Sequence, residues 1–253
     1  MIRIAFIAGI AFTFTVGGFA YAQSLDSDGD GRSDHDERAI YYTDPEKEDT
    51  DGDGYSDGEE ITNGFSPRHG KGIRLAQSDS DKDGLDDAFE LAYGTSIMNA
   101  DSDDDGYKDR HEIWNGYDPR TRKPTRVKKR IVVTLAKQEL SYYVDDIRMA
   151  TEIISSGKRN WPTPKGEFHI ANKHPRAWSK MAGLWMPYWM ALGGGKFPTG
   201  LYGIHELPEW PGGYKEGANH LGTPVSHGCI RLGVGPAQEL YEWTQIGTSV
   251  SIQ

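Results

Sequence analysis

Residues 226–231 read Ser-His-Gly-Cys-Ile-Arg, and residues 202–205 read Tyr-Gly-Ile-His. These two stretches hold Cys229, the only cysteine of the 253-residue chain, and two of its eight histidines. A thiol is weakly ionised at neutral pH, and a neighbouring imidazole can take its proton to leave a strong nucleophile. Gly228 lets the backbone approach closely, so main-chain N–H groups of residues 227–229 can stabilise an oxyanion. The two stretches therefore predict an enzyme with a cysteine nucleophile.

Two plainer explanations exist for Cys229. A lone cysteine is commonly an inert, buried small hydrophobe, and a thiol can also bind zinc together with histidines. Packing alone gives no reason to surround a buried thiol with serine, histidine and glycine. His205, His227 and Cys229 also lack the close spacing that is typical of zinc ligands. Nucleophilic catalysis is therefore the favoured interpretation.

The sequence around these stretches has the pattern of a mainly β domain. Apolar and polar residues alternate in several segments from residue 130 onward. The expected strands are residues 131–135, 139–144, 147–155 and 167–170. Asp145 and Asp146 suit a hairpin turn between two of them. One short helix is expected near the C-terminus, at residues 236–243, because Pro236 suits a first helical position and Gly247 lies beyond the end.

Ser226 to Arg231, with Gly203-Ile204-His205 upstream, resembles the signature of the L,D-transpeptidases, the YkuD-like enzymes of bacterial cell walls. Similar segments extend over residues 128–253, including Pro162-Thr-Pro-Lys-Gly166. The resemblance implies a YkuD-like β-sandwich whose cysteine attacks a peptidoglycan stem peptide. In that family the cysteine attacks the carbonyl of the third stem residue and expels the terminal D-alanine. The acyl group then passes to an amine on another stem.

The resemblance also implies a role for each residue of the site. The implied catalytic residues are Cys229, His205, His227, Gly228 and Ser226. Cys229 is the nucleophile, and His205 is the general base and acid. His227 supports the thiolate or the oxyanion geometry, and Ser226 supplies an orienting hydroxyl. Arg231 can bind a substrate carboxylate through two hydrogen bonds, and no cofactor is required for the catalytic step.

One departure from the family pattern affects the choice of base. His205 and Ser226 are separated by 20 residues, somewhat more than the family's usual interval. His220 lies inside this longer loop and is an alternative base. His205 is favoured because it follows a strand-like segment, as in the family pattern.

Charge divides the chain into two parts. Residues 23–120 contain 28 acidic and 10 basic residues, whereas residues 121–253 contain 10 acidic and 17 basic residues. Such asymmetry indicates two modules with different partners. The acidic part argues against nucleic acid as a ligand, and the basic part can face an anionic polymer or a membrane surface.

The acidic part is a repeat. The pattern Asp-x-Asp-x-Asp-Gly-x-x-Asp-x-x-Glu occurs four times, in loops 1 to 4, which start at residues 26, 49, 79 and 101. Such a loop suits calcium, because alternate carboxylates, one main-chain carbonyl and a last bidentate glutamate supply the oxygens. A solvated acidic spacer has no reason to keep glycine sixth and glutamate twelfth. The expected Ca²⁺ ligands are Asp26, Asp28, Asp30, Arg32, Asp34 and Glu37; Asp49, Asp51, Asp53, Tyr55, Asp57 and Glu60; Asp79, Asp81, Asp83, Leu85, Asp87 and Glu90; and Asp101, Asp103, Asp105, Tyr107, Asp109 and Glu112, of which Arg32, Tyr55, Leu85 and Tyr107 give their carbonyls.

These EF-hand-like loops are similar to thrombospondin type 3-like or dockerin-like calcium repeats, because their starts are too close for two full helices around each loop. A short apolar run and a glycine follow three of the closing glutamates, which predicts one or two helical turns with a glycine stop. The aromatic residues expected to pack between loops are Tyr41, Phe65, Tyr93 and Tyr117. Without metal, the crowded carboxylates predict an expanded module that becomes compact when calcium binds.

Residues 1–22 have the features of a secretory signal, with Arg3 near the start, an apolar run and the small-residue pattern Ala20-Tyr21-Ala22. An uncleaved membrane anchor is the alternative. Residues 119–130 contain two prolines and seven basic residues, which indicates a linker that faces either the acidic module or a polyanionic wall polymer. The predicted organisation is a signal peptide (1–22), four calcium-binding repeats (23–120), a basic linker (121–129) and a catalytic domain (130–253).

The sequence therefore predicts an exported L,D-transpeptidase of the periplasm or cell envelope, active in peptidoglycan biosynthesis, cell-wall organisation and cell shape, with a calcium-stabilised N-terminal module. Its expected partners are peptidoglycan stem peptides and, through the calcium module, an envelope protein. Two alternatives remain open at this point. The same acyl-enzyme handed to water makes an L,D-carboxypeptidase, and a non-catalytic, calcium-dependent surface protein would only bind the wall. Cys229 and both motif histidines count against the last alternative, since binding needs no thiol.

Overall fold

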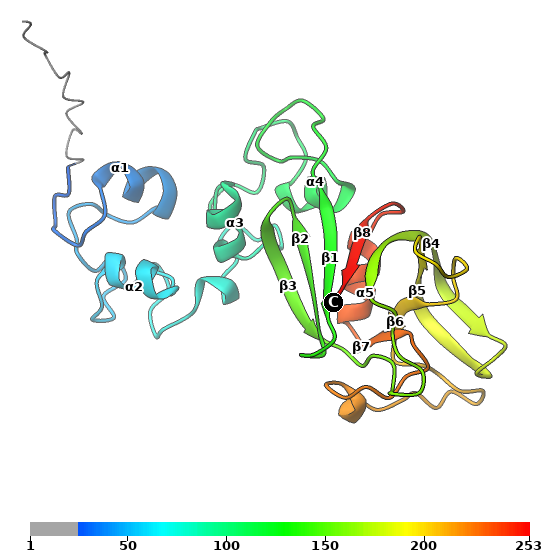
Figure 1. The fold of residues 1–253 in the computed structure, drawn as a ribbon. Helices are drawn as coiled ribbons and strands as arrows, with labels where there is room; N and C mark the ends of the chain where they lie inside the picture. Colours follow the sequence, from blue (N-terminus) through cyan, green and yellow to red (C-terminus); the bar gives the residue numbers. More distant parts are fainter. Residues whose placement is uncertain (1–24) are drawn as a thin grey trace, which may run out of the picture.

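The computed structural model describes residues 25–253, and the predicted signal peptide lies outside these residues. Short helices and loops on the N-terminal side are followed by a domain built mainly of strands (Figure 1). The predicted fold class is confirmed. Among the described residues, no helix combines the length and the apolarity needed to cross a membrane.

Each acidic loop leads into a short helix. The helical segments are α1 (Asp34–Asp36), its π-helical continuation η1 (Glu37–Tyr41), α2 (Asp57–Asn63), the 3-10 turn η2 (Leu75–Gln77), α3 (Asp87–Tyr93) and α4 (Asp109–Asn115). Gly64, Gly94 and Gly116 end α2, α3 and α4 with a left-handed backbone, at φ 78°, 90° and 81°. Glycine adopts this conformation without steric penalty, so the predicted helical turns with glycine stops are confirmed.

The four loops form two similar pairs. Within the first pair, the backbone N–H of Gly58 in loop 2 donates to Asp30 Oδ2 in loop 1 at 2.7 Å. Within the second pair, the backbone N–H of Arg110 in loop 4 donates to Asp83 Oδ2 in loop 3 at 2.8 Å. The chain makes an equivalent antiparallel bridge after each pair, Phe65 to Arg74 and Tyr117 to Arg126. The repeat unit of the folded module is therefore a pair of loops.

The strands form one eight-stranded sheet in the order β3-β2-β1-β8-β4-β5-β6-β7. They are β1 (Lys129–Thr134), β2 (Glu139–Val144), β3 (Ile147–Ile153), β4 (Gly166–Ser179), β5 (Leu184–Gly193), β6 (Gly203–Glu206), β7 (Ile230–Leu232) and β8 (Ser249–Ile252). β1 runs parallel to β8 and β6 runs parallel to β7, whereas the other neighbours are antiparallel. A long loop containing the 3-10 turn η3 (Ala218–His220) joins β6 to β7.

Strand β4 extends well beyond the predicted segment, residues 167–170. Its second half contains charged residues such as Lys173 and Arg176, so the alternation typical of a half-buried strand is lost there. Pairing with β5 continues as far as Ser179 and satisfies the backbone hydrogen bonds without a buried face. The resulting β4–β5 hairpin reaches out from the rest of the sheet (Figure 1).

The predicted C-terminal helix is α5 (Pro236–Trp243), which has the expected bounds and buries its apolar side in the core. The ammonium group of Lys129 donates to the carbonyl of Trp243 at 2.8 Å and to the carbonyl of Trp114 at 3.0 Å. Carbonyl groups at a helix C-terminus have no partner within the helix, so the Lys129 side chain satisfies them. Lys129 therefore joins the helix of loop 4 to α5.

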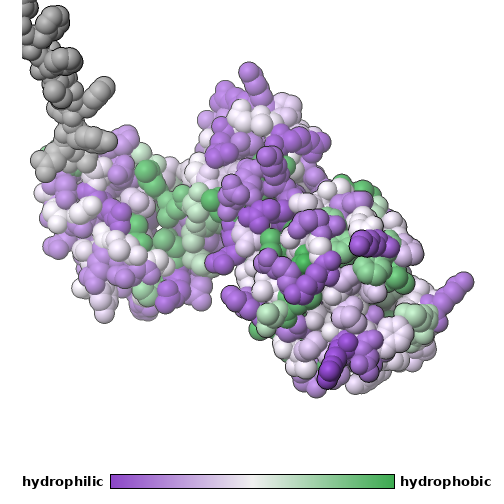
Figure 2. Space-filling view, viewed as in Figure 1, coloured by the Kyte–Doolittle hydropathy of each residue, from purple (hydrophilic) through white to green (hydrophobic). Residues whose placement is uncertain are grey.

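The second pair of loops packs on the sheet. Leu85, Phe89, Tyr93 and Ile113 belong to the same apolar core as the buried residues of β1 and β2, and Tyr93 Oη donates to Asp145 Oδ2 at 3.3 Å. Among the described residues, no side chain of the first pair belongs to that core. Tyr93 was expected to pack between loops; it stacks on Phe89 of the same helix and also reaches the sheet through the shared core. Hydrophobic surface is visible between the first pair and the rest of the molecule (Figure 2).

The basic segment before β1 lies against the second pair of loops. Arg120 donates to the carbonyl of Tyr93 at 3.0 Å, and Arg126 donates to the carbonyl of Asn115 at 2.9 Å. These carbonyls lie at the C-terminal ends of α3 and α4, where a positive charge is favourable. The basic segment was expected to face either the acidic module or a polyanionic wall polymer. In the structure it contacts the acidic module.

Candidate active site and calcium loops

Two adjacent parallel strands place the predicted nucleophile and base together. In the pairing of β6 with β7, Ile204 lies opposite Ile230 and His205 lies opposite Arg231. Cys229 immediately precedes β7, and its side chain lines the same cleft as His205 and Arg231. The sheet register thus brings together residues that a long loop separates in sequence.

One cleft contains this group. It is lined by His205, Ser226, His227, Cys229 and Arg231 and, from the β4–β5 hairpin and the segments beside it, by Trp178, Ser179, Lys180, Met181, Ala182, Leu184, Met186, Trp189, Gly200 and Leu201. His220, the alternative base, is not part of this lining. The geometry therefore favours His205 over His220.

His205 is held in the form that a general base requires. Its Nδ1 lies 2.5 Å from the backbone carbonyl of Glu206, which can only accept a hydrogen bond. Nδ1 therefore carries the proton, and Nε2 is left as the acceptor. Burial lowers the pKa of His205 to about 3, and the positive charge of Arg231 acts in the same direction. The imidazole is consequently neutral at physiological pH.

Cys229 requires this base. Burial raises the pKa of its thiol, while a backbone hydrogen bond from Gly203 and the charge of Arg231 oppose that rise. The thiol is thus protonated in the resting protein at neutral pH. Proton transfer to His205 must accompany its attack on a carbonyl, because the thiolate is the nucleophile.

The Ser226 hydroxyl fixes the turn that presents Cys229. It donates to the Cys229 carbonyl at 2.6 Å and accepts from the Gly228 N–H at 3.1 Å. Gly228 has φ +108°, and a Cβ there would lie 2.5 Å from Tyr202 Cε1, so the turn needs glycine. The Gly228 N–H, one of the main-chain donors expected at an oxyanion, is bonded to the Ser226 hydroxyl in the structure.

His227 lies at the exposed rim of the cleft. Its Nε2 is 3.3 Å from the Lys158 ammonium, and its ring meets the edge of Trp161 with 5.4 Å between centroids. Partial burial and the nearby charges of Lys158 and Arg231 lower its pKa. His227 is therefore a neutral rim residue whose ring nitrogen faces Lys158.

Arg231 already has an acidic partner. Its Nη1 donates to both carboxylate oxygens of Glu216 at 2.9 Å, and His220 Nδ1 lies 2.8 Å from one of them. Arg231 Nε is buried without a partner. A two-point grip on a carboxylate needs two neighbouring guanidinium nitrogens. Nη1 is bonded to Glu216 and Nε is buried, so each neighbouring pair contains one nitrogen that a substrate cannot use. The expected two-point grip of Arg231 on a substrate carboxylate is not available in this arrangement.

The acidic loops have the donor groups of a cation site. In every loop the first, third and fifth aspartates offer oxygens within 4.8 Å of one another. In each loop a third-position aspartate and the closing glutamate also have buried oxygens without a hydrogen-bond partner; these residues are Asp28, Glu37, Asp51, Glu60, Asp81, Glu90, Asp103 and Glu112. Burial and the neighbouring carboxylates raise the pKa of Glu37, Glu60 and Glu112 to about 7 and that of Glu90 to about 10. A bound cation would offset this repulsion and give the buried oxygens a partner, so the residues fit Ca²⁺.

The ninth-position aspartates are hydrogen-bonded within their own loops. Both oxygens of each accept hydrogen bonds from the N–H and the hydroxyl of the serine or threonine at position two. The pairs are Asp34 with Ser27, Asp57 with Thr50, Asp87 with Ser80 and Asp109 with Ser102. These bonds hold the loop in its curved form, and direct binding of the ion by these four aspartates stays a prediction.

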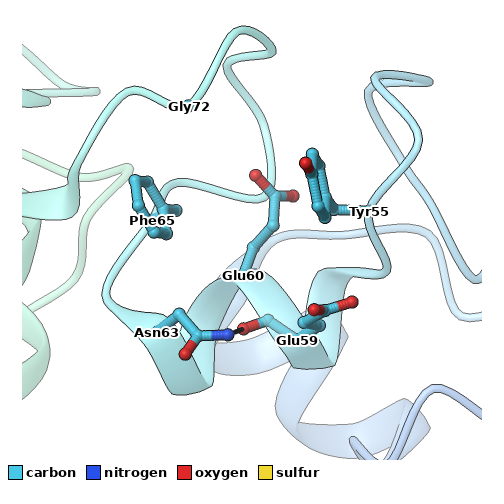
Figure 3. Close-up of a pocket in the computed structure, with 6 residues that line it drawn as sticks. All are labelled: Tyr55, Glu59, Glu60, Asn63, Phe65 and Gly72. Atoms are coloured by element: carbon cyan, nitrogen blue, oxygen red, sulfur yellow. Dashed lines mark hydrogen bonds between the residues drawn. The ribbon is translucent and has the colours of Figure 1, made fainter.

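Figure 3 shows the closing carboxylate of loop 2. Glu60 points from α2 toward the overlying loop that carries Gly72, beside the ring of Tyr55. The Asn63 side chain, which lines the same pocket, donates to the Glu59 carbonyl at 2.8 Å. A pocket at the same repeat positions in loop 4 is lined by Tyr107, His111, Glu112, Asn115 and Tyr117. The second member of each loop pair thus presents its closing glutamate in an equivalent hollow.

Comparison with known proteins finds two families along the chain. The model of the L,D-transpeptidase catalytic domain (YkuD) matches residues 128–252, and the model of the bacterial TSP3 repeat matches residues 26–47, 49–64 and 79–95. The presumed L,D-transpeptidase YkuD of Bacillus licheniformis is 34% identical over 134 residues, which make up 53% of this chain and 71% of that protein. The chain belongs to the L,D-transpeptidase family.

Solved L,D-transpeptidases are among the structures to which the chain is similar. One from Mycobacterium smegmatis is 20% identical with a TM-score of 0.44, over 51% of this chain and 60% of that one. Another, from Stackebrandtia nassauensis, is 26% identical with a TM-score of 0.41, over 50% of this chain and 55% of that one. The chain therefore covers less than two thirds of either solved chain.

Sequence reasoning missed two parts of this L,D-transpeptidase cleft. Trp178 and Met181 reach it from the β4–β5 hairpin, which was predicted too short. Glu216 reaches Arg231 from the β6–β7 loop. The unusual length of that loop was the available signal, since an added segment beside a catalytic motif has to pack somewhere.

Proposed function

We propose that this protein is an exported L,D-transpeptidase that acts on peptidoglycan stem peptides through an acyl-enzyme on Cys229. The observation that carries the proposal is the placement of Cys229 beside a neutral, tautomer-fixed His205 in one cleft at β6 and β7. Family membership supports the choice of reaction. The predicted leader supports export, because peptidoglycan lies outside the cytoplasm.

The first half of the proposed reaction makes a thioester. His205 Nε2 takes the thiol proton as Cys229 Sγ attacks the carbonyl carbon of the third stem residue. When the tetrahedral intermediate collapses, the C–N bond to the terminal D-alanine breaks. The imidazolium gives its proton to the departing amine, so free D-alanine leaves and His205 is neutral again.

The second half transfers the acyl group. The side-chain amine of a diamino acid on another stem attacks the thioester while His205 takes a proton from that amine. The C–S bond then breaks, and the imidazolium returns the proton to the sulfur of Cys229. The products are a new amide cross-link and the original enzyme. Water in place of the amine would give the carboxypeptidase reaction.

The proposal includes Ca²⁺ in the four acidic loops. The first, third and fifth aspartates, the seventh carbonyl and the closing glutamate of each loop would hold the ion. Bound calcium supplies positive charge that offsets the grouped carboxylates. The ninth-position aspartates and their serine or threonine partners keep the loop ready for it. No part of the chemistry at Cys229 passes through these sites.

The test is to incubate the protein and its Cys229→Ala variant with disaccharide-tetrapeptide in the presence of calcium and to identify the products by mass spectrometry. Cross-linked dimers formed only by the unaltered protein are expected. Tripeptide without dimers would assign the carboxypeptidase reaction instead. An unchanged substrate, even with an added amine acceptor, would refute the enzymatic proposal and favour a calcium-dependent wall-binding protein.

A further inference from the structure

A buried ion pair lies between β7 and the long β6–β7 loop. Arg231 and Glu216 are each 9% exposed, and a single guanidinium nitrogen donates to both carboxylate oxygens at 2.9 Å. Removing two charges from water is unfavourable unless they meet in good geometry, and removal of one partner leaves a buried charge uncompensated. The contact is therefore a fixed part of the site and unlike a surface salt bridge.

Arg231 directs its charge at the reacting groups. It lies opposite His205 in the strand register and lines the same cleft as Cys229. Its positive charge lowers the pKa values of both the Cys229 thiol and the His205 imidazole. A cation in this place favours the thiolate and keeps the base neutral before the reaction. The position and net charge of the guanidinium therefore matter for attack.

The loop reaches both sides of the catalytic pair with two consecutive residues. Lys215 Nζ lies 2.5 Å from Glu206 Oε1, and Glu206 is the residue whose carbonyl accepts from His205. Glu216 binds Arg231, and its own N–H donates to the Pro208 carbonyl at 2.9 Å. The added length of the loop thus holds one charged partner beside the base and another beside the nucleophile.

We propose that Glu216 is a positioning residue of the active site, which fixes the Arg231 guanidinium beside Cys229 and offsets part of its charge. The inference rests on the proposed function, since Cys229 is taken as the nucleophile. Arg231 then acts as a fixed charge at the thiol, and a substrate carboxylate does not have to displace Glu216 for the reaction to proceed.

The experiment measures the rate of Cys229 alkylation by iodoacetamide against pH in the calcium-loaded full chain. Four proteins are compared: the unaltered chain, Glu216→Gln, Arg231→Gln and the double variant. Glu216→Gln is expected to lower the pH midpoint by about one unit, because the arginine charge is no longer offset. Arg231→Gln is expected to raise it. The double variant is expected to have the Arg231→Gln midpoint, because Glu216 acts through Arg231.

Glu209→Gln is the matched control. Glu209 lies in the same loop and pairs with Arg176 at 3.0 Å and Lys215 at 3.2 Å, outside the cleft lining. Its substitution is expected to leave the midpoint unchanged. In the transpeptidation assay, Glu216→Gln is expected to lower kcat about tenfold with little change in KM, because a displaced charge affects attack more than binding.

Thermal unfolding separates positioning from simple stability. Arg231→Gln alone leaves Glu216 as a buried charge and is expected to unfold at a lower temperature, whereas the neutral double variant recovers part of that loss. A lower unfolding temperature for Glu216→Gln with an unchanged alkylation midpoint would overturn the inference. A double-variant midpoint shift equal to the sum of the two single-variant shifts would also overturn it. Alkylation needs no peptidoglycan. If the alkylation midpoints shift as expected but no cross-links form, only the proposed function is refuted.

Discussion

The two pairs of acidic loops have the same ligand pattern and the same ninth-position hydrogen bonds, yet only the second pair shares a core with the L,D-transpeptidase domain. The difference lies in residues that face away from the ion. Position seven is Arg32 in loop 1 and Leu85 in loop 3, and position eleven is Asp36 in loop 1 and Phe89 in loop 3. Ligand positions thus determine the cation site, while the outward positions decide what a loop packs against.

This difference links only the second pair to the stability of the catalytic domain. Glu90 of loop 3 is fully buried with both carboxylate oxygens unpartnered, and Ile113 of α4 is equally buried in the shared core. Calcium that holds these loops closed would also hold the surface on which β1 and β2 pack. All seven tryptophans lie at Trp114 or later in the chain, so tryptophan fluorescence reports on this part of the molecule alone.

Calcium removal is expected to have the largest effect. Two occupied sites, each at about 100 times its dissociation constant, stabilise the folded state by about 2.7 kcal/mol apiece, which corresponds to a shift of about 10–20 °C in unfolding temperature. A chelator should therefore lower the unfolding temperature seen by tryptophan fluorescence by that amount, and added calcium should restore it. Equal unfolding temperatures with and without calcium would show that the second pair does not couple metal to the catalytic domain.

Matched substitutions in the two pairs give the next largest effect. Glu60 and Glu112 close loops 2 and 4, are 4% and 6% exposed, and both have a pKa raised to about 7. Glu112→Gln removes one ligand from the coupled pair and should lower the tryptophan-detected unfolding temperature in calcium by about 3–8 °C, as a ten- to hundredfold weaker site would.

Glu60→Gln is the control for this comparison. It should lower the number of calcium ions bound, measured by titration calorimetry, while the tryptophan-detected transition stays in place. Equal shifts from the two variants would mean that all four loops form one cooperative unit with the catalytic domain.

The site was more predictable than its surroundings. His205 and Cys229 lie in short motifs whose chemistry depends on local residue types, and the parallel pairing of β6 with β7 completes them. The contact between Glu216 and Arg231 could not be predicted from sequence, because it depends on how the long β6–β7 loop folds back. The bond from the Gly228 N–H to the Ser226 hydroxyl could not be predicted for a similar reason.

The fold was predictable where pattern and burial coincide. Strand β2 and helix α5 have the predicted bounds, because one face of each is buried and apolar. The outer half of β4 has no such face, and its pairing with β5 is a tertiary contact that leaves no alternation to detect. The docking of Tyr93 was missed because an aromatic residue suits a loop interface as well as a sheet.

Lys129 provides a pH test of the junction between loop 4 and α5. Burial, with the charges of Lys173 and Arg126, lowers its pKa to about 7, whereas the unfolded chain has the ordinary value near 10.5. The unfolded state therefore binds more protons between these values, so stability should rise as pH increases from about 7 to 10 and be lost as pH falls back through about 7.

Lys129→Met removes the titrating group and should flatten this part of the curve of unfolding free energy against pH, measured by urea titration in calcium. Lys71, which follows loop 2, is the control position, and Lys71→Met should keep the rise. A curve of unchanged slope in Lys129→Met would assign the pH dependence to another group.

The smallest expected effect comes from removing a single tyrosine hydroxyl group, either at the junction with the catalytic domain or on the exposed surface between the pairs. Tyr93 Oη donates to Asp145 Oδ2 at 3.3 Å across the junction, whereas Tyr42 Oη and Ser96 Oγ meet at 2.8 Å on the exposed surface between the pairs. Tyr93→Phe should reduce the tryptophan-detected unfolding free energy by about 1 kcal/mol, the usual net contribution of such a bond. Tyr42→Phe should change it by less than about 0.5 kcal/mol, because water replaces an exposed partner. A larger loss from Tyr42→Phe than from Tyr93→Phe would assign the coupling between the metal loops and the catalytic domain to the first pair. The reason is that removing a contact lowers the tryptophan-detected stability only if that contact breaks when the tryptophan-bearing part unfolds.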